Sequence, residues 1–591
     1  YDRTYNSAVN NVFHFRSPDL TGMGQYKIST FSSPDIRIFD VSENFNSKII
    51  VPISYSNGIA VFQSNHNANY LREYFAIGGD NYLTPKSISQ RIDNQNLRGI
   101  TEGATFIIIS PKDFMEAAYK LKQHRETPGV DYIKTIVIDI DQIYNEFSGG
   151  LLDPVAIRNF LKHAFYNWSV APFYVMFLGD GTYDFRNIYN VPVRNWLPPI
   201  QTDSPNVDEV VSYPSDDFFI EFNENYVEPQ PGKPDMATGR LCVNSLDEAN
   251  NVVQKIIEYE SGSNNGIWKK TNMYVADDGW TTSQTGGGEG NIHTFQSEII
   301  AENMTPPDFE KQKIYIVTYP TTVTPQGRRK PQANEDIING WNEGKLVINY
   351  VGHGSTDLWA HEQIFERQTS IPRLVNKGKY PFVTIPSCDL ARFDDPFSLS
   401  AGEELVNIRE RGAIGVLAAS RPVYSSPNAA FNEAVWNHFM NLKDTLNLPI
   451  RIGKSIYLAK QLVGLANSNS AKFFLLSDPT VRVDIPQYFT VIDSINNYTG
   501  SDTAEIKALQ KVKLSGRILH PDSTFWNTFN GSISIKVFDV ERHITYFDFG
   551  IPFRFRLDGG KLFTGNTTVE NGLWTIEFVV PKDISYATGN G

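Results

Sequence analysis

A histidine and a cysteine that follow two buried strands are the residues of this sequence best suited to nucleophilic chemistry. Leu346–Val351 and Phe382–Pro386 are apolar, β-branched and aromatic runs, which is typical of buried strands in a parallel sheet. The first run leads into His353 and the second into Cys388. Reactive groups gather at the carboxyl edge of an open α/β sheet. The pattern therefore predicts that these two side chains face each other at one edge of a central sheet.

A thiol becomes a good nucleophile only when it loses its proton, and a neighbouring imidazole can take that proton. We therefore predict a cysteine peptidase in which His353 and Cys388 form a catalytic dyad. The backbone N–H groups of Gly354 and Cys388 would form the oxyanion hole for the reacting carbonyl. Gly352 and Gly354 also permit backbone angles that are closed to other residues.

Other interpretations of these residues are structural or metal-binding. A cysteine after a buried strand commonly packs as a small apolar residue, and we expect this role for Cys242. The histidines show neither zinc-finger nor HExxH spacing, and no GxxxxGK[ST] phosphate loop is present. We therefore expect no metal at the dyad and no required cofactor. The acidic turn Asp277-Asp278 is suited to a structural calcium ion.

Composition argues against several classes of function. The formal net charge of the 591-residue chain is −13, which disfavours nucleic acid or an anionic membrane surface as the main partner. Two cysteines provide no disulfide framework. No apolar run approaches the roughly 18 residues that a membrane-spanning helix needs. The first residues lack the pattern of a secretory signal, and we expect both ends to be cuts in a longer precursor.

Changes in sequence texture predict four domains. Residues 1–98 consist of short alternating segments, which indicates a β-rich module. Residues 99–268 and 269–486 alternate buried strands with helical segments, as βαβ units do, and predict two α/β subdomains with mostly parallel sheets and flanking helices. Residues 487–591 return to short alternating strands, which predicts an immunoglobulin-like β-sandwich that is truncated at its end.

The motifs at the two strand ends resemble those of the gingipain-type cysteine peptidases, whose fold is shared with caspases and legumains. The resemblance rests on NYVGHG, on a following strand that ends in SC, and on LGDGTYD, YPSDDFF, VADDG and LLSDPTVRV between Gly99 and Pro486. Within the group, QIYNEFSGG and NYVGHGSTDLWAHEQIF are most similar to the PorU-type sortases of the type IX secretion system. The resemblance implies a caspase/gingipain-like fold for both α/β subdomains.

The resemblance also implies an activity. Such sortases are surface transpeptidases that remove the C-terminal sorting domain of secreted cargo and attach the new carboxyl end to lipopolysaccharide. Cys388 would form a thioester with the cargo, while His353 would act as general base and then as general acid. The implied partners are cargo proteins with a sorting domain, an outer-membrane β-barrel of the PorV type, and lipopolysaccharide as the acceptor. The implied location is the extracellular face of the outer membrane.

Gingipain-type enzymes orient the catalytic histidine with an upstream acidic residue. The candidates in this sequence are Asp203, Asp208, Glu209, Asp216 and Asp217. We expect Asp216, in the YPSDDFF segment, either to orient His353 or to line the specificity pocket. Trp359 and the His361-Glu362 pair are expected to pack rather than to wall the cleft.

Two further functions stay open at this point. One is a secreted gingipain-like endopeptidase that only hydrolyses, since an acceptor site is not a sequence motif. The other is a non-enzymatic scaffold subunit of a secretion complex, in which the His353–Cys388 dyad is vestigial. The intact Gly-His-Gly and Ser-Cys sequences argue against the scaffold.

Overall fold

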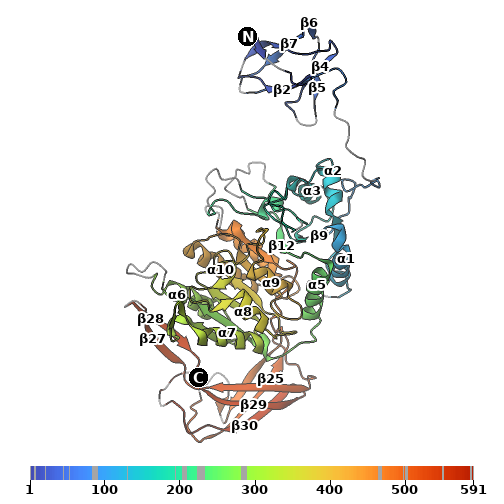
Figure 1. Ribbon diagram of the computed structural model, residues 1–591. Coiled ribbons are helices and arrows are strands. Elements are labelled where there is room, and N and C mark those ends of the chain that lie inside the picture. The colour runs from blue at the N-terminus through green and yellow to red at the C-terminus, as the bar shows by residue number, and fades with distance from the viewer. Residues whose placement is uncertain are drawn as a thin grey trace. The chain divides into compact units, whose positions relative to one another are not determined.

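The chain divides into two compact units, Tyr1–Asn94 and Gln95–Gly591. Figure 1 shows the elements of each unit. The computed structural model describes the chain except at positions 1, 6–7, 20, 44–45, 52, 69, 83–90, 130, 193–194, 203–208, 223–232, 281–288, 464–468, 497, 500–503, 549–550, 586, 588 and 590–591. Two of the acidic residues that are candidates for orienting His353, Asp203 and Asp208, therefore lie outside the described residues.

The N-terminal unit is built from two four-stranded sheets, with strand orders β1-β3-β7-β6 and β2-β8-β4-β5. Its core is aromatic: Tyr26, Phe62 and Tyr74 are buried and their rings contact one another. The predicted β-rich N-terminal region is therefore confirmed. Its strands are β1 (Asp2–Tyr5), β2 (Val12–Arg16), β3 (Gly22–Ile28), β4 (Ile36–Asp40), β5 (Lys48–Ile49), β6 (Ser54–Ser56), β7 (Ile59–His66) and β8 (Glu73–Gly78).

The second unit is organised around a ten-stranded sheet of order β10-β9-β11-β12-β22-β21-β20-β17-β13-β14. Neighbouring strands are parallel except at β21 and β22, which pair antiparallel, so two parallel halves run in opposite directions. The expected mostly parallel α/β architecture is confirmed. The strands are β9 (Phe106–Ser110), β10 (Thr135–Asp139), β11 (Tyr174–Leu178), β12 (Ala237–Leu241), β13 (Thr271–Ala276), β14 (Glu310–Tyr315), β17 (Val347–Val351), β20 (Phe382–Ile385), β21 (Gly415–Ala419) and β22 (Phe473–Leu476).

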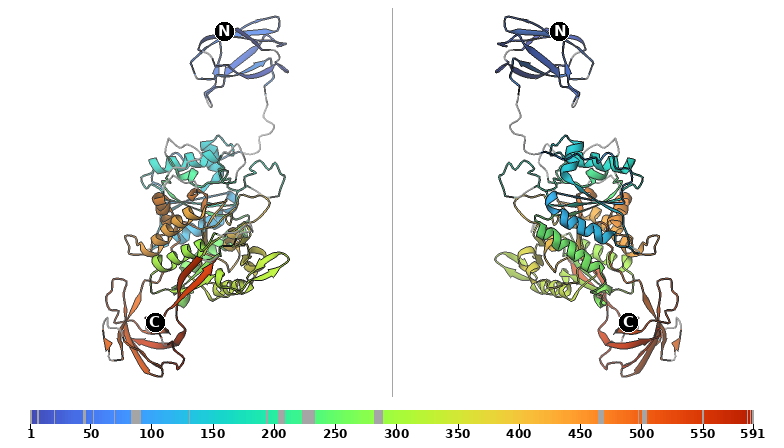
Figure 2. Two further views of the ribbon diagram at one scale, coloured as in Figure 1. Left: turned by 90° about the vertical axis from the view of Figure 1, so that its left-hand side faces the viewer. Right: turned by 90° about the vertical axis from the view of Figure 1, so that its right-hand side faces the viewer.

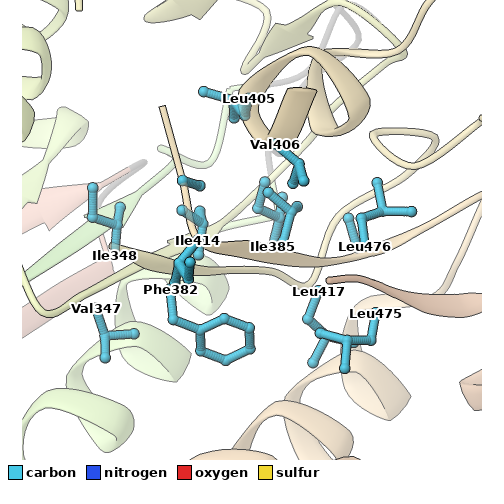
Figure 3. Packing of buried hydrophobic residues seen from close by; sticks show 14 of the residues in the cluster. Val347, Ile348, Phe382, Ile385, Leu405, Val406, Ile414, Leu417, Leu475 and Leu476 are labelled. Atoms are coloured by element: carbon cyan, nitrogen blue, oxygen red, sulfur yellow. The ribbon is translucent and has the colours of Figure 1, made fainter. Parts of the chain in front are cut away.

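Helices cover both faces of this sheet (Figure 2), which explains why its central strands are apolar along their whole length. Successive side chains alternate between the faces. In Figure 3, Val347 and Phe382 project to one side of the sheet while Ile348 and Ile385 project to the other. The helices are α1 (Met115–Arg125), α2 (Ile140–Phe147), α3 (Pro154–Asn167), α4 (Asp217–Ile220), α5 (Leu246–Glu260), α6 (Ile292–Ile299), α7 (Pro331–Glu343), α8 (Arg367–Ser370), α9 (Ala401–Asn407), α10 (Ser425–Asn441) and α11 (Ile452–Val463).

Local sequence signals fix where several of these helices begin. The Asp153 carboxylate caps α3 by accepting the N–H of Val155, and Pro154 occupies the first turn, where no backbone donor is needed. Ser400 and Glu403 form a reciprocal capping box at the start of α9. These caps satisfy backbone donors that a helix end would otherwise bury unpaired.

The C-terminal region is β-rich, as predicted, and its strands form a six-stranded antiparallel sheet of order β24-β23-β25-β30-β29-β26. The remaining pair, β27 and β28, is a hairpin that extends to the α/β part beside α6 (Figures 1 and 2). These strands are β23 (Phe489–Ile495), β24 (Tyr498–Thr499), β25 (Lys511–Leu519), β26 (Gly531–Phe538), β27 (Arg542–Asp548), β28 (Ile551–Leu557), β29 (Lys561–Glu570) and β30 (Leu573–Val579); smaller pairs elsewhere are β15 (Thr322–Thr324) with β16 (Gly327–Arg329) and β18 (Leu358–Trp359) with β19 (Phe365–Glu366).

The β27–β28 hairpin is anchored in the α/β core. Phe555 is buried, and its ring lies 5.1 Å from that of Tyr315 on β14. Lys313 donates to the carbonyl of Arg556 at 2.6 Å, and the Arg556 N–H donates to Glu298 of α6 at 3.1 Å. The hairpin therefore braces α6, a helix whose first turn reaches the candidate active site.

Within the described residues, no helix is both long and apolar enough to cross a membrane.

We expect the substitution Phe555→Ala to lower the free energy of unfolding by about 3–5 kcal/mol, because it leaves a cavity in the α/β core. Phe547→Ala in the same hairpin is the matched control: that side chain is 63% exposed, so its loss should cost no more than about 0.5 kcal/mol. Urea unfolding measures both values. Equal effects of the two substitutions would show that the hairpin does not share the core.

Candidate active site

His353 and Cys388 lie on touching loops at one edge of the sheet. β17 and β20 are adjacent and parallel, with Ile348 opposite Val383, so both loops leave the sheet at the same edge. A Cβ atom placed on Gly354 would lie 2.5 Å from Ser387 Oγ and 3.2 Å from the Cys388 carbonyl oxygen. The histidine loop therefore packs directly on the cysteine loop.

The two glycines that flank His353 are required for space. Neither Gly352 nor Gly354 is among the glycines with positive φ, so backbone angle is not the reason for either residue. A Cβ on Gly352 would lie 2.3 Å from Cβ of Asp277. A side chain at either position would push the histidine loop away from its neighbours.

The backbone N–H groups of Gly354 and Cys388 donate no hydrogen bond within the described residues. Gly354 forms an isolated antiparallel bridge with Trp359, and the hydrogen bonds of this bridge run between the flanking residues. Both N–H groups are thus available to an oxygen atom of a ligand. This is the property that an oxyanion hole requires.

The Cys388 thiol is hydrogen-bonded to the backbone of Val423. Its sulfur accepts the Val423 N–H at 3.4 Å, and its S–H donates to the Val423 carbonyl at 3.6 Å. Burial raises the pKa of Cys388 above the ordinary 9.0, a shift that the Val423 N–H opposes and that Asp389 reinforces. The resting cysteine is therefore a protonated thiol at neutral pH.

The His353 ring lies among other titratable side chains. Its Nε2 is 3.3 Å from Glu289 Oε2, and the same oxygen is 3.0 Å from Nε2 of His293. The ring of His361 lies 4.9 Å from that of His353. Burial and the neighbouring His293 lower the pKa of His353, against the opposing effect of Glu289. The imidazole is thus neutral at pH 7 and able to accept a proton, although no hydrogen bond joins it to the Cys388 sulfur.

Asp277 holds the backbone of the histidine loop. It follows β13, the other neighbour of β17, and its N–H donates to the carbonyl of Val351 at 2.9 Å. Its carboxylate accepts the N–H of His353 at 3.0 Å. Burial raises the pKa of Asp277 well above the ordinary value. Asp277 is therefore a positioning residue for His353.

Asp216 forms a buried ion pair with Arg240. Both of its carboxylate oxygens accept hydrogen bonds from Arg240, at 2.9 and 2.7 Å, and both side chains are buried. The adjacent Asp217 is paired with Lys460 of α11 at 2.7 Å. The YPSDDFF segment thus ties a long connection to the α/β core. Among the described residues, the carboxylates that contact His353 are Asp277 and Glu289.

Neither of these two carboxylates is among the acidic residues predicted to orient His353. Asp277 is predicted only as part of a calcium-binding turn, although its place directly after a buried strand is a usable signal. Glu289 precedes α6 and His293 lies in its first turn, four residues later, a spacing that brings the two side chains together. Their proximity to His353 depends on sheet order. Trp359 and Cys242 are buried, in agreement with the expected packing roles.

A structural calcium ion is predicted at the Asp277-Asp278 turn. Asp277, Asp278 and Glu362 each offer an oxygen within 4.8 Å of the other two. Lys330 lies 3.1 Å from Asp278, and Arg328 lies 3.1 Å from Glu362. These cations already compensate the carboxylates, so calcium would have to displace them. Calcium at this turn stays a prediction.

A thiol and an imidazole on adjacent strand ends, beside two unused N–H groups, form the kind of site that a cysteine peptidase uses. Residues 100–484 match the family model of peptidase family C25, and the chain belongs to this family. Lys-gingipain HG66 and Lys-gingipain W83 of Porphyromonas gingivalis are each 25% identical to the chain, over 203 and 202 residues. These matches cover 34% of this chain and 10% of each relative, so the chain matches about a tenth of their length.

Two solved structures are similar to the chain. Dimeric latent PorU from Porphyromonas gingivalis is 19% identical, with a TM-score of 0.49 over 98% of this chain and 49% of that chain. The Arg specific cysteine proteinase gingipain R is 17% identical, with a TM-score of 0.49 over 82% of this chain and 93% of that chain. The chain is thus a member of peptidase family C25 that carries a thiol and an imidazole at adjacent strand ends.

We predict that Asp216→Asn lowers the free energy of unfolding by about 3–5 kcal/mol, because it leaves Arg240 buried without its counter-charge. Glu209→Gln is the control, since it removes an exposed partner of Arg392 and should cost no more than about 1 kcal/mol. Activity per folded molecule should persist in Asp216→Asn. Unchanged stability with a large loss of kcat would instead support an orienting role for Asp216.

The rate at which iodoacetamide alkylates Cys388 should be low near pH 7 and should rise with pH beyond 9.0, because only the thiolate reacts and burial raises the pKa of this thiol. Mass spectrometry of the digested protein measures the rate at each cysteine. Cys242 is 2% exposed and should stay unmodified in the folded protein. A fast rate that does not change between about pH 6 and pH 8 would reveal a thiolate–imidazolium pair and contradict this account.

Proposed function

We propose that the protein is a sortase of the PorU type, which cuts the C-terminal sorting domain from secreted cargo and joins the new carboxyl end to an amine on lipopolysaccharide. The observation that carries the catalytic part is the contact between the His353 and Cys388 loops beside two unused N–H groups. The transpeptidase part rests on the sequence motifs that resemble PorU-type sortases. The matching partners are a PorV-type outer-membrane barrel and cargo at the extracellular face of the outer membrane.

The first half-reaction begins with a proton transfer. The Cys388 thiol leaves Val423 and passes its proton to the neutral imidazole of His353. The thiolate attacks the carbonyl carbon of the cargo, and the resulting oxyanion accepts hydrogen bonds from the N–H groups of Gly354 and Cys388. The C–N bond then breaks, and His353 gives its proton to the leaving amine. The product is a thioester between the cargo and Cys388.

The second half-reaction resolves the thioester. An acceptor amine attacks the carbonyl carbon while His353 takes a proton from the nitrogen. The C–S bond breaks, and the proton returns to the sulfur, which regenerates the resting thiol. With water as the acceptor the same steps give hydrolysis, which is the reaction of a gingipain-like endopeptidase.

The surrounding carboxylates would support the charged form of His353. Glu289 is 3.3 Å from the ring nitrogen and raises the affinity of the imidazole for a proton. Asp277 fixes the backbone from which the ring projects. Both groups would act through His353 and not on the substrate itself.

The test is a cleavage assay with a cargo fragment that carries its sorting domain, in the presence of increasing concentrations of a primary amine. Mass spectrometry should detect a cargo–amine conjugate that grows at the expense of hydrolysed cargo. Cys388→Ala should abolish cleavage, and His353→Ala should reduce kcat/KM by at least about 10²-fold.

Hydrolysed cargo alone at every amine concentration would exclude the sortase and leave the endopeptidase. Unchanged cargo processing by Cys388→Ala would exclude the catalytic assignment and support the scaffold. Ser387→Ala is a matched control, because it changes the neighbouring residue without removing the thiol.

A further inference from the structure

We propose that Asp277, His293 and His353 form a binding site for Zn²⁺ or a similar transition-metal ion, and that an ion bound there switches the peptidase off by occupying the imidazole of His353. The regulatory half of this inference rests on the proposed function, whereas the binding site itself does not. No step of the reaction uses His293.

The three side chains come together from separate elements. Asp277 follows β13, His293 is in the first turn of α6, and His353 follows β17. Each offers one ligand atom, and these atoms lie within 4.8 Å of one another. Ligands of a tetrahedral zinc ion stand about 3.3 Å apart, given bonds of roughly 2.0–2.1 Å. Small side-chain rotations would therefore close the site around an ion.

One buried ring nitrogen in this cluster has no partner: Nδ1 of His293, a residue that is only 5% exposed. Nε2 of His353 makes no hydrogen bond of good geometry, although it lies 3.3 Å from Glu289. Buried polar atoms of native proteins are normally satisfied, so an orphaned nitrogen beside two other potential ligands indicates a missing ligand. Asp277 is 1% exposed and adds a carboxylate oxygen beside them.

The donor set selects the kind of ion. Imidazole nitrogen with one carboxylate oxygen suits zinc and its neighbours, whereas calcium takes six to eight oxygen ligands. Glu289 lies 3.0 Å from His293 and 3.3 Å from His353, so a second carboxylate is at hand to complete the coordination. The fourth position can otherwise be taken by water or by substrate.

Binding would stop the reaction for a simple reason. A nitrogen lone pair that is donated to the metal is not free to accept the proton of Cys388. The ion would also hold the histidine loop against α6, the helix that the β27–β28 hairpin braces.

The experiment is an isothermal titration of Zn²⁺ into the full chain that carries Cys388→Ala, a substitution that removes the thiol as an alternative ligand. We expect one saturable site. Adding His293→Gln should weaken the zinc affinity by at least 10-fold, while adding His163→Gln, at a half-buried histidine of α3, should leave it unchanged. Circular dichroism confirms that each variant is folded, and Co²⁺ titration of the Cys388→Ala protein gives a second readout through its visible bands.

Each outcome bears on one half of the inference. Absence of binding in Cys388→Ala, or equal affinity with and without His293, would overturn the site. Zinc that binds there but leaves cleavage by the unmodified peptidase unaffected would overturn the switch. Because the titration uses an inactive variant, its result is independent of whether the protein joins cargo to an amine or only hydrolyses it.

Discussion

The parallel pairing of β13, β17 and β20 is the constraint on which the candidate active site depends. Val275 is opposite Tyr350, and Ile348 is opposite Val383, so the three strands end at a common edge. Asp277, His353 and Cys388 follow these ends, and helices on both faces bury the strands that carry them. A slip of one residue in register would turn each strand's side chains to the opposite face, which packing forbids.

The second feature of the site is that the Cys388 thiol and the His353 imidazole are both uncharged at rest, whereas the proposed reaction needs a thiolate and an imidazolium. Burial keeps the Cys388 thiol protonated and the His353 imidazole neutral, and the thiol is hydrogen-bonded to Val423. In the proposed reaction the sulfur and the ring must therefore come together before proton transfer begins. Such a resting state limits reaction of the thiol with oxidants and stray electrophiles, since only a thiolate is a strong nucleophile.

The strands of the site could be predicted from sequence because they depend on local composition. Leu346–Val351 and Phe382–Pro386 are apolar without interruption, and the structure places β17 and β20 within them. Glu289 could not be placed, because its contact with His353 follows from where α6 packs. The prediction that Asp216 orients His353 or lines the specificity pocket rests on its residue type. Its ion pair with Arg240 is set by tertiary structure. The β27–β28 hairpin alternates like any sheet strand, so its insertion into the α/β core has no local signal.

The most direct test of the central claim is a crystal structure of the protein after reaction with a peptidyl chloromethyl ketone. We expect a thioether at Cys388, the inhibitor's oxygen within hydrogen-bond distance of the Gly354 and Cys388 N–H groups, and the His353 ring within reach of the sulfur. A bond to any other residue, or an inhibitor oxygen that points away from these two N–H groups, would contradict it.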